Sequence, residues 1–167
     1  RPSWFFETGG FRTSGWNLAA KRALDLAASS SLLLIALPVL TMAEIAIKVE
    51  SPGPVLYRQH RIGRWGHPFT LIKFRSMRQD AEATGRPQWA SIGDARITRV
   101  GSIIRKTRID EIPQAFNVLK GEMSFVGPRP ERPEFVDMLA QQIPFYRERH
   151  CVKPGITGWA QLNYPYG

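Results

Sequence analysis

The apolar stretch Leu26–Ala43, LAASSSLLLIALPVLTMA, decides how this chain folds. Its 18 residues carry no charge. As a helix they would reach about 27 Å, slightly less than the roughly 30 Å of a hydrocarbon core. Pro38 lies inside the stretch, and a proline removes a backbone donor and clashes with the preceding turn. The sequence therefore predicts a helix that is kinked or broken at Pro38.

The charges on the two sides of this stretch do not orient a membrane crossing. Lys21 and Arg22 precede it and Lys48 follows it, so neither side has a clear excess of positive charge. We therefore predict a re-entrant helix that dips into one leaflet and returns. Backbone groups freed at the bend would be satisfied by the hydroxyls of Ser29–Ser31 or Thr41. A straight span and a buried helix of a soluble protein are the alternatives.

Positive charge is concentrated in one part of the chain. The 167 residues include 23 Lys and Arg against 14 Asp and Glu, a formal net charge of +9 at pH 7. The segment from Arg58 to Arg108 contains 12 basic and three acidic residues, and so accounts for the whole excess. This predicts an anionic partner, which could be nucleic acid, phospholipid headgroups or a phosphorylated small molecule. A solvated basic face is the alternative.

The composition is that of an ordinary globular domain. With 43% hydrophobic and 22% charged residues, the chain is neither a disordered tail, a collagen nor a long coiled coil. Cys151 is the only cysteine, which excludes an internal disulfide and a multi-cysteine zinc site. We predict an α+β fold that is mainly helical. It would combine the re-entrant helix with amphipathic interfacial helices and a small β-hairpin.

The hairpin is predicted by two short apolar runs. Residues 55–57 and 69–72 flank a loop over residues 61–68 that contains two glycines. The second strand would lead into Lys73 and Arg75.

Two helices are predicted further along the chain. The first covers residues 99–108, and the second begins at Pro113, because proline is favoured in the first turn of a helix. Apolar residues recur at helical spacing in both segments. The predicted core faces consist of Val100, Ile103 and Ile104 in the first helix, and of Ile112, Phe116 and Leu119 in the second.

Asp110 and Glu111 form an acidic pair between these two helices. They directly follow a basic run and lie at the positive end of the second helix, so both influences would favour ionised carboxylates. Adjacent helical residues point in different directions. One carboxylate is thus suited to be a nucleophile and the other to hold a hard divalent cation. A capping pair with surface ion pairs is the alternative.

Arg129 lies between Pro128 and Pro130, which restrict the backbone that presents its side chain. An arginine held this rigidly is suited to bind a phosphate. A turn whose arginine points to solvent is the alternative.

In combination, these segments resemble the monotopic phosphoglycosyl transferases, bacterial enzymes also called polyprenyl-phosphate sugar-phosphate transferases. The resemblance covers roughly Leu18–Gln161. Its motifs are Lys21-Arg22 with the proline-interrupted helix, KFRSM at 73–77, RIDEIPQ at 108–114, NVLKG at 117–121, VGPRP at 126–130 and PGITGWAQ at 154–161. The ending NYPYG at 163–167 is similar to that of the branch linked to exopolysaccharide assembly. One departure is Leu37, since members of the family commonly have serine before the proline.

The resemblance implies transfer of a sugar phosphate from a UDP-sugar to polyprenyl (undecaprenyl) phosphate, with release of UMP. The reaction would occur at the cytoplasmic face of the bacterial inner membrane. Asp110 would attack the β-phosphate to form a covalent aspartyl phosphosugar intermediate, while Glu111, with Asp110, would hold Mg²⁺. The phosphate-binding residues implied in this way are Arg105, Arg129, Lys73, Arg75 and Arg108. A homodimer is left open.

The expected organisation has three parts. Residues 1–16 would be the remnant of a linker, 17–50 the re-entrant helix, and 51–167 a catalytic domain on the cytosolic face that lacks the family's usual C-terminal extension. Nucleic-acid binding is disfavoured by the apolar stretch, the acidic pair and the lack of a zinc-finger or RNP-like motif. The alternative function is a non-catalytic anchor that binds anionic lipid through the basic segment.

Overall fold

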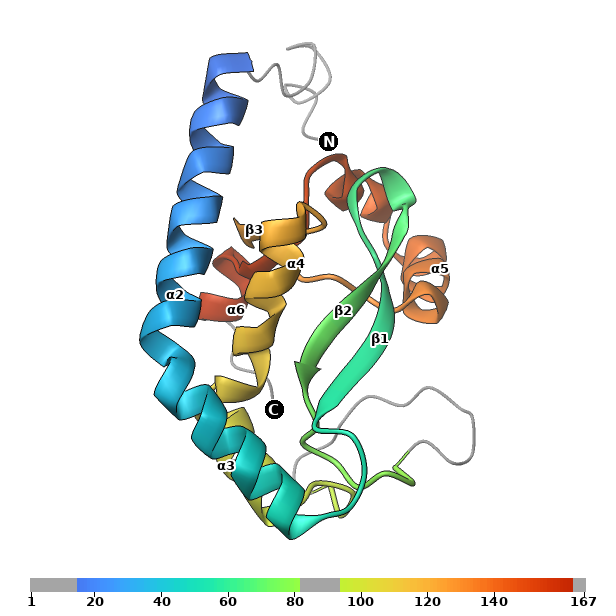
Figure 1. The fold of residues 1–167 in the computed structure, drawn as a ribbon. Helices are drawn as coiled ribbons and strands as arrows, with labels where there is room; N and C mark the ends of the chain where they lie inside the picture. Colours follow the sequence, from blue (N-terminus) through green and yellow to red (C-terminus); the bar gives the residue numbers. More distant parts are fainter. Residues whose placement is uncertain (1–14, 82–93, 164–167) are drawn as a thin grey trace.

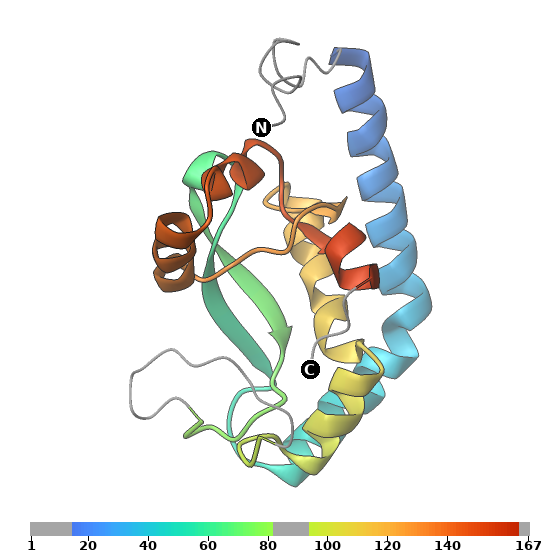
Figure 2. The ribbon, with the colours of Figure 1, turned by 180° about the vertical axis from the view of Figure 1, so that it is seen from behind.

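The structure is a computed structural model that describes residues 15–81 and 94–163. The expected linker over residues 1–16 lies almost wholly outside the described residues, as does most of the ending at 163–167. Helix α2 (Gly15–Glu50) runs along one side of the molecule, and a two-stranded hairpin occupies the other. Helix α4 (Ala115–Lys120) lies between them, as the two opposite views in Figures 1 and 2 show.

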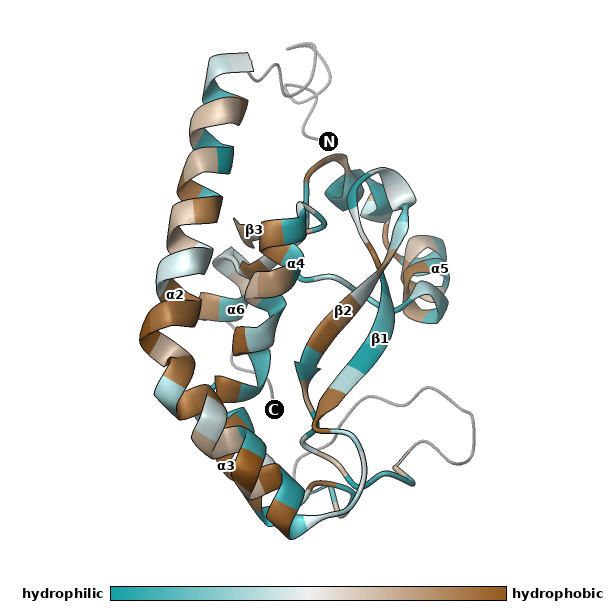
Figure 3. Ribbon diagram, in the orientation of Figure 1, coloured by the Kyte–Doolittle hydropathy of each residue, from teal (hydrophilic) through white to brown (hydrophobic). Residues whose placement is uncertain are grey.

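Helix α2 contains Pro38 without ending there. Its axis changes direction about halfway along (Figure 1), within a strongly apolar part of the helix (Figure 3). The proline therefore bends α2 but does not break it. The Thr41 hydroxyl donates to the Leu37 carbonyl at 3.0 Å, beside the proline. Thr41 is one of the hydroxyls that the sequence predicted near the bend.

The outer side of α2 is largely exposed. Only 17% of its most apolar 18-residue window is buried, which argues against the core helix of a soluble protein. The helix is long and apolar enough to cross a membrane. The residues that α2 buries against the rest of the chain are Asp25, Ser29, Ala36, Ala43 and Ile47.

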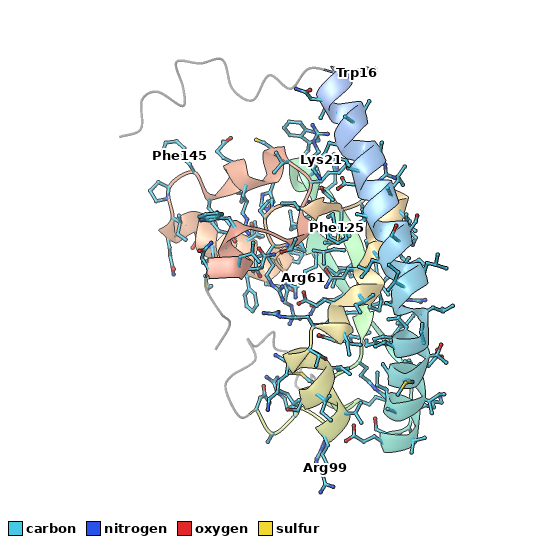
Figure 4. The ribbon with its side chains drawn as sticks, turned by 90° about the vertical axis from the view of Figure 1, so that its left-hand side faces the viewer. Trp16, Lys21, Arg61, Arg99, Phe125 and Phe145 are labelled. Atoms are coloured by element: carbon cyan, nitrogen blue, oxygen red, sulfur yellow. The ribbon has the colours of Figure 1, made fainter. Side chains whose placement is uncertain are left out.

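Polar side chains attach the N-terminal half of α2 to the rest of the chain. The Asp25 carboxylate accepts hydrogen bonds from the Phe125 amide (3.0 Å), the Ser124 hydroxyl (3.1 Å) and Lys21 Nζ (2.6 Å). Arg22 donates to the carbonyls of residues 118 and 119, at the end of α4, at 2.6 and 2.8 Å. Figure 4 shows Lys21 and Phe125 near one another. The charged residues that flank the apolar stretch thus also hold α2 against α4 and the short strand that follows α4 in the chain.

The predicted hairpin is present. Strands β1 (Leu56–Ile62) and β2 (Pro68–Phe74) pair antiparallel, and the short 3-10 turn η1 (Arg64–Gly66) lies in the loop between them. The register places Tyr57 opposite Lys73 and Arg61 opposite Phe69. Because side chains alternate between faces of a strand, Phe69 and Leu71 share a face, where they form a core cluster with Val118 and Met123.

The first predicted helix is α3 (Arg99–Lys106). Its N-cap is Thr98, whose side chain accepts a hydrogen bond from the Gly101 amide. Ile104 is buried beside Ala43, Ile47 and Phe74, with Val100 packed against the same cluster. The predicted core position of Ile103 is wrong, since this side chain is 62% exposed.

The second predicted helix begins differently from the prediction. Residues Ile109–Gln114 form the 3-10 helix η2, and α-helical geometry starts only with α4. A 3-10 helix has three residues per turn, so it shifts the phase of the helix that follows. Ala115 and Val118 are consequently buried, whereas Phe116, predicted to face the core, is 49% exposed.

The remaining elements pack around the hairpin and α4. Strands β3 (Ser124–Val126) and β4 (Gly155–Thr157) form a parallel pair that the sequence did not predict. Gly155 in β4 allows this strand to lie very close to the loop that follows β3, because a Cβ on Gly155 would lie 2.6 Å from the Cα of Gly127 in that loop. The elements that complete the chain are α5 (Pro133–Gln142), η3 (Tyr146–Cys151) and α6 (Trp159–Asn163).

Candidate active site

Asp110 and Glu111 lie in the first turn of η2, packed between β2, α3 and α2. Arg108, which caps this turn, has a φ of 59° in the left-handed region. A residue with a side chain is strained there, and such strain is found most often at functional sites. The conformation turns the chain sharply between α3 and η2, and so directs Asp110 inward.

Asp110 is a buried carboxyl group, with 7% of the residue exposed. Burial, followed by the charge of Glu111, raises its pKa to about 6, while Lys73, Arg105 and Arg108 oppose this rise. The nearby cations favour the ionised form, as expected from the sequence, but the effect of burial is larger. Desolvation outweighs the cations because a buried carboxylate loses its hydration whatever charges lie nearby.

The two carboxylates have different surroundings. Glu111 Oε1 accepts a hydrogen bond from Arg129 Nη1 at 3.1 Å and lies 3.5 Å from Arg108 Nη1. Within residues 15–81 and 94–163, no hydrogen bond or ion pair engages the Asp110 carboxylate. Glu111 is therefore held in place by arginines, whereas Asp110 is available to react.

Lys73, near the end of β2, places a further cation close to Asp110. Burial, together with the charges of Arg61, Arg129 and Arg105, lowers its pKa to about 8, while Asp110 opposes this effect. Its ammonium group lies 5.3 Å from the centre of the Tyr57 ring. The structure thus gathers four of the predicted phosphate-binding residues near Asp110, namely Lys73, Arg105, Arg108 and Arg129.

Arg75 has a different position from these four. It is buried, and its guanidinium donates to the Pro52 carbonyl (2.7 Å), the Ser51 carbonyl (2.8 Å) and the Ser51 hydroxyl (2.8 Å). Gly53, with a φ of +109°, completes the turn against which the guanidinium packs. We therefore assign Arg75 to the turn that joins α2 to β1, and not to the phosphate-binding set.

Arg61 is a site residue that the sequence analysis missed. Its Nη2 donates to Gln59 Oε1 at 2.6 Å and its Nη1 to the Pro130 carbonyl at 3.2 Å, next to Arg129. Its Nε atom is buried and has no partner among the described residues. The alternation of β1 places residues 57, 59 and 61 on one face, so strand periodicity could have found it.

A magnesium ion fits the donors of the acidic pair. Mg²⁺ in proteins is usually held by one or two carboxylates, with waters and substrate phosphates completing its octahedron. Asp110 has both oxygens available within the described ranges, and the arginine contacts of Glu111 involve Oε1 and not Oε2. The described residues contain no group of three or more His, Cys, Asp and Glu side chains that could hold a metal ion.

An apolar helix, joined to a cluster of cations around a carboxylate that has no hydrogen bond or ion pair in the described part of the chain, is suited to a membrane-associated protein that binds phosphorylated molecules. Residues 16–167 match the family model described as bacterial sugar transferase, and the chain belongs to this family. The resemblance stated from the sequence is thereby confirmed.

Curated relatives agree with this assignment. The chain is 51% identical over 146 residues to UDP-N-acetylgalactosamine-undecaprenyl-phosphate N-acetylgalactosaminephosphotransferase of Aeromonas hydrophila, covering 87% of this chain and 34% of the relative. It is 46% identical over 153 residues to UDP-glucose:undecaprenyl-phosphate glucose-1-phosphate transferase of Escherichia coli (strain K12), and the match covers 90% of this chain and 32% of that relative. It is 44% identical over 154 residues to exopolysaccharide production protein PSS of Rhizobium leguminosarum bv. phaseoli, and the match covers 88% of this chain and 75% of that relative. The chain thus spans about a third of the length of the first two relatives.

Proposed function

We propose that this chain transfers a sugar phosphate from a UDP-sugar to undecaprenyl phosphate, with release of UMP. The observation that carries the proposal is the buried Asp110 carboxylate, which has no partner in the described part of the chain and is surrounded by cations. A diphosphate substrate needs such cations for binding, and its transfer needs a nucleophile. The names of the relatives supply the substrate class.

The reaction would proceed in two displacements at phosphorus. In the first, an Asp110 oxygen attacks the β-phosphorus of the UDP-sugar, the bond to the α-phosphate oxygen breaks, and UMP leaves. In the second, an oxygen of the lipid phosphate attacks the aspartyl phosphosugar, and Asp110 leaves as a carboxylate. A pKa of about 6 makes Asp110 more basic than an ordinary aspartate while leaving it mostly ionised at pH 7.

The surrounding residues would bind and orient the phosphates. Lys73, Arg105, Arg108 and Arg129 place positive charge where negative charge collects in the transition state. Arg129 and Arg108 also hold Glu111 beside the nucleophile. Mg²⁺, held by Glu111 and Asp110, would supply further neutralisation of phosphate charge when bound.

The proposal is tested by measuring UMP release from the protein in detergent, with Mg²⁺, undecaprenyl phosphate and a panel of UDP-sugars. Asp110→Asn should abolish release, since an amide cannot act as an anionic nucleophile. Asp137→Asn is the matched control, because Asp137 is exposed and, among the residues that the structure describes, forms only a surface ion pair with Arg147. Turnover of Asp110→Asn within tenfold of the parent would exclude Asp110 as the nucleophile, whereas no UMP release from the parent protein with any UDP-sugar would favour the non-catalytic anchor.

We also propose that α2 is re-entrant at the cytoplasmic face of the inner membrane. As a helix of 36 residues it is about 54 Å long, well beyond one hydrocarbon core, and it is bent at its middle. Trp16 and Val49, which are 83% and 82% exposed, lie near its two ends. In a Cys151→Ser background, Trp16→Cys and Val49→Cys should both react with a membrane-impermeant maleimide from the cytoplasmic side. Labelling from opposite sides would establish a straight span.

The exopolysaccharide role is a finer proposal. It is supported by the name of the Rhizobium relative, of which this chain covers 75%. A deletion strain should lose its extracellular polysaccharide and recover it with the parent gene but not with Asp110→Asn.

A further inference from the structure

A second cationic site lies at the opposite end of the hairpin from Asp110. A pocket of about 440 Å³ is formed by the hairpin loop, the residues that follow α4, and Lys153. The pocket begins at the start of β2, and Thr70, the lining residue nearest to Lys73 along the strand, is three residues from it. At about 3.3 Å per residue of strand, Thr70 is roughly 10 Å from Lys73, the residue that accompanies Asp110. The pocket and the candidate active site are therefore centred at opposite ends of the hairpin, with Arg61, the partner of Phe69 in the register, between them.

Two cationic side chains of this pocket have unused donors. Among the described residues, the Lys153 ammonium group makes no hydrogen bond or ion pair, although the residue is half-buried. Arg64 uses its Nε on the Cys151 carbonyl at 3.2 Å and stacks on Trp65, and its two Nη groups have no hydrogen-bond partner in the described part of the chain. Positive groups in a pocket with unused donors are suited to bind an anion.

The surroundings of Lys153 favour an anion further. An ideal Cβ on Gly121 would lie 3.6 Å from Lys153 Nζ and 3.7 Å from Arg22 Nη2, so both cations approach the same glycine. Burial, with the charges of Arg22 and Arg64, lowers the pKa of Lys153. The C-terminal carbonyls of α4 would repel an anion, but Arg22 already covers two of them. The one acidic residue lining the pocket, Glu122, has its Oε2 bound by Asn117 Nδ2 at 2.6 Å.

We propose that this pocket binds a phosphate group carried by a larger molecule, with Lys153 and Arg64 as its ligands. The volume exceeds that of a single phosphate ion, so a polar group attached to the phosphate fits beside it. Two sources share this chemistry. One is the phosphodiester of a membrane lipid, since Arg22 lies four residues before the apolar stretch, and the other is a soluble phosphorylated molecule. The inference does not rest on the proposed transferase activity.

Phosphate binding tests the site directly. Inorganic phosphate is titrated by calorimetry into the detergent-solubilised protein in an Arg129→Ala background, which weakens any phosphate site around Asp110. Lys153→Ala should weaken the remaining binding about tenfold or more, and Lys153→Arg should retain it. Arg58→Ala, the same loss of one charge from an exposed position of β1, should stay within twofold. Equal weakening by Lys153→Ala and Arg58→Ala, or no binding in this background, would overturn the proposal.

Vesicle flotation identifies the source of the phosphate. Vesicles of phosphatidylcholine alone are compared with equal parts of phosphatidylcholine and phosphatidylglycerol. The site is assigned to lipid if Lys153→Ala floats less than the parent protein with the mixed vesicles but not with phosphatidylcholine vesicles, and if inorganic phosphate competes with the flotation of the parent protein. Unchanged flotation with lost phosphate binding assigns it to a soluble molecule. Arg64→Gln serves as a second variant should Lys153→Ala fail to give the parent near-ultraviolet circular dichroism spectrum.

Discussion

Replacement of Arg75 by alanine separates a structural role from a substrate-binding role. In the structure this side chain makes three hydrogen bonds to Ser51 and Pro52, at 2.7 to 2.8 Å, and only 7% of the residue is exposed. A hydrogen bond from a charged donor contributes at least about 1 kcal/mol to stability, and the truncation leaves carbonyls without partners. We therefore expect Arg75→Ala to lower the free energy of unfolding by about 3 kcal/mol.

The expected loss is large enough to measure by thermal unfolding. For a chain of this size, each kcal/mol corresponds to about 2–4 °C in Tm, so Arg75→Ala should lower Tm by roughly 6–12 °C. The KM for the UDP-sugar, measured well below Tm, should stay within about twofold, because Arg75 faces the turn and not Asp110. Circular dichroism and UMP release provide the two readouts.

Arg78→Ala is the matched control for this variant. Arg78 lies three residues further along the chain and is exposed, so its removal should change neither Tm nor KM. The assignment of Arg75 to the turn would be refuted if Arg75→Ala kept the parent Tm while KM for the UDP-sugar rose tenfold.

Three further outcomes are expected. The kcat/KM for the UDP-sugar should rise with pH through about 6, as Asp110 ionises, and fall above about 8, as Lys73 loses its proton. In Lys73→Arg, which stays charged, the alkaline fall should disappear, and its persistence would exclude Lys73 as the cause. Glu111→Gln should raise the Mg²⁺ concentration needed for half-maximal turnover, whereas an unchanged titration would contradict metal binding by Glu111. Asp25→Ala should lower the free energy of unfolding by about 3 kcal/mol in a denaturant titration, since it removes the acceptor of the Phe125 amide and leaves Lys21 with the Ser124 hydroxyl but without its ion-pair partner. A loss below about 0.5 kcal/mol would contradict this role.

The elements that could be predicted from the sequence are those fixed by local patterns. The apolar stretch around Pro38, the two apolar runs that flank the glycine-containing loop of the hairpin, and the helix over residues 99–108 depend on neighbours in the chain. The burial of α4 could not be predicted in this way. Its phase depends on the 3-10 geometry of η2, and nothing in the spacing of Ile112 and Phe116 indicates that geometry.

The candidate site shows the same limit. Asp110 and Glu111 stand out because they are acidic in a basic segment. Arg75 and Arg129, by contrast, are both arginines within recognisable motifs, and only the packing shows that one closes a turn while the other contacts Glu111. The pKa of Asp110 could not be predicted from the sequence either, because it is set mainly by burial, and burial depends on residues distant in the chain.

The docking of α2 has a consequence for how the chain is made. Lys21 and Arg22 contact residues 96 to 103 positions later in the chain, so α2 leaves the ribosome long before its partners exist. At about 5–20 residues per second, the delay is roughly 5–20 s. During this interval Lys21 and Asp25, four residues apart on one helix, can neutralise each other without help from β3. The ion pair thus matches the charges of Lys21 and Asp25 before the rest of the chain is made, and Ser124 and Phe125 join it only when synthesis reaches them.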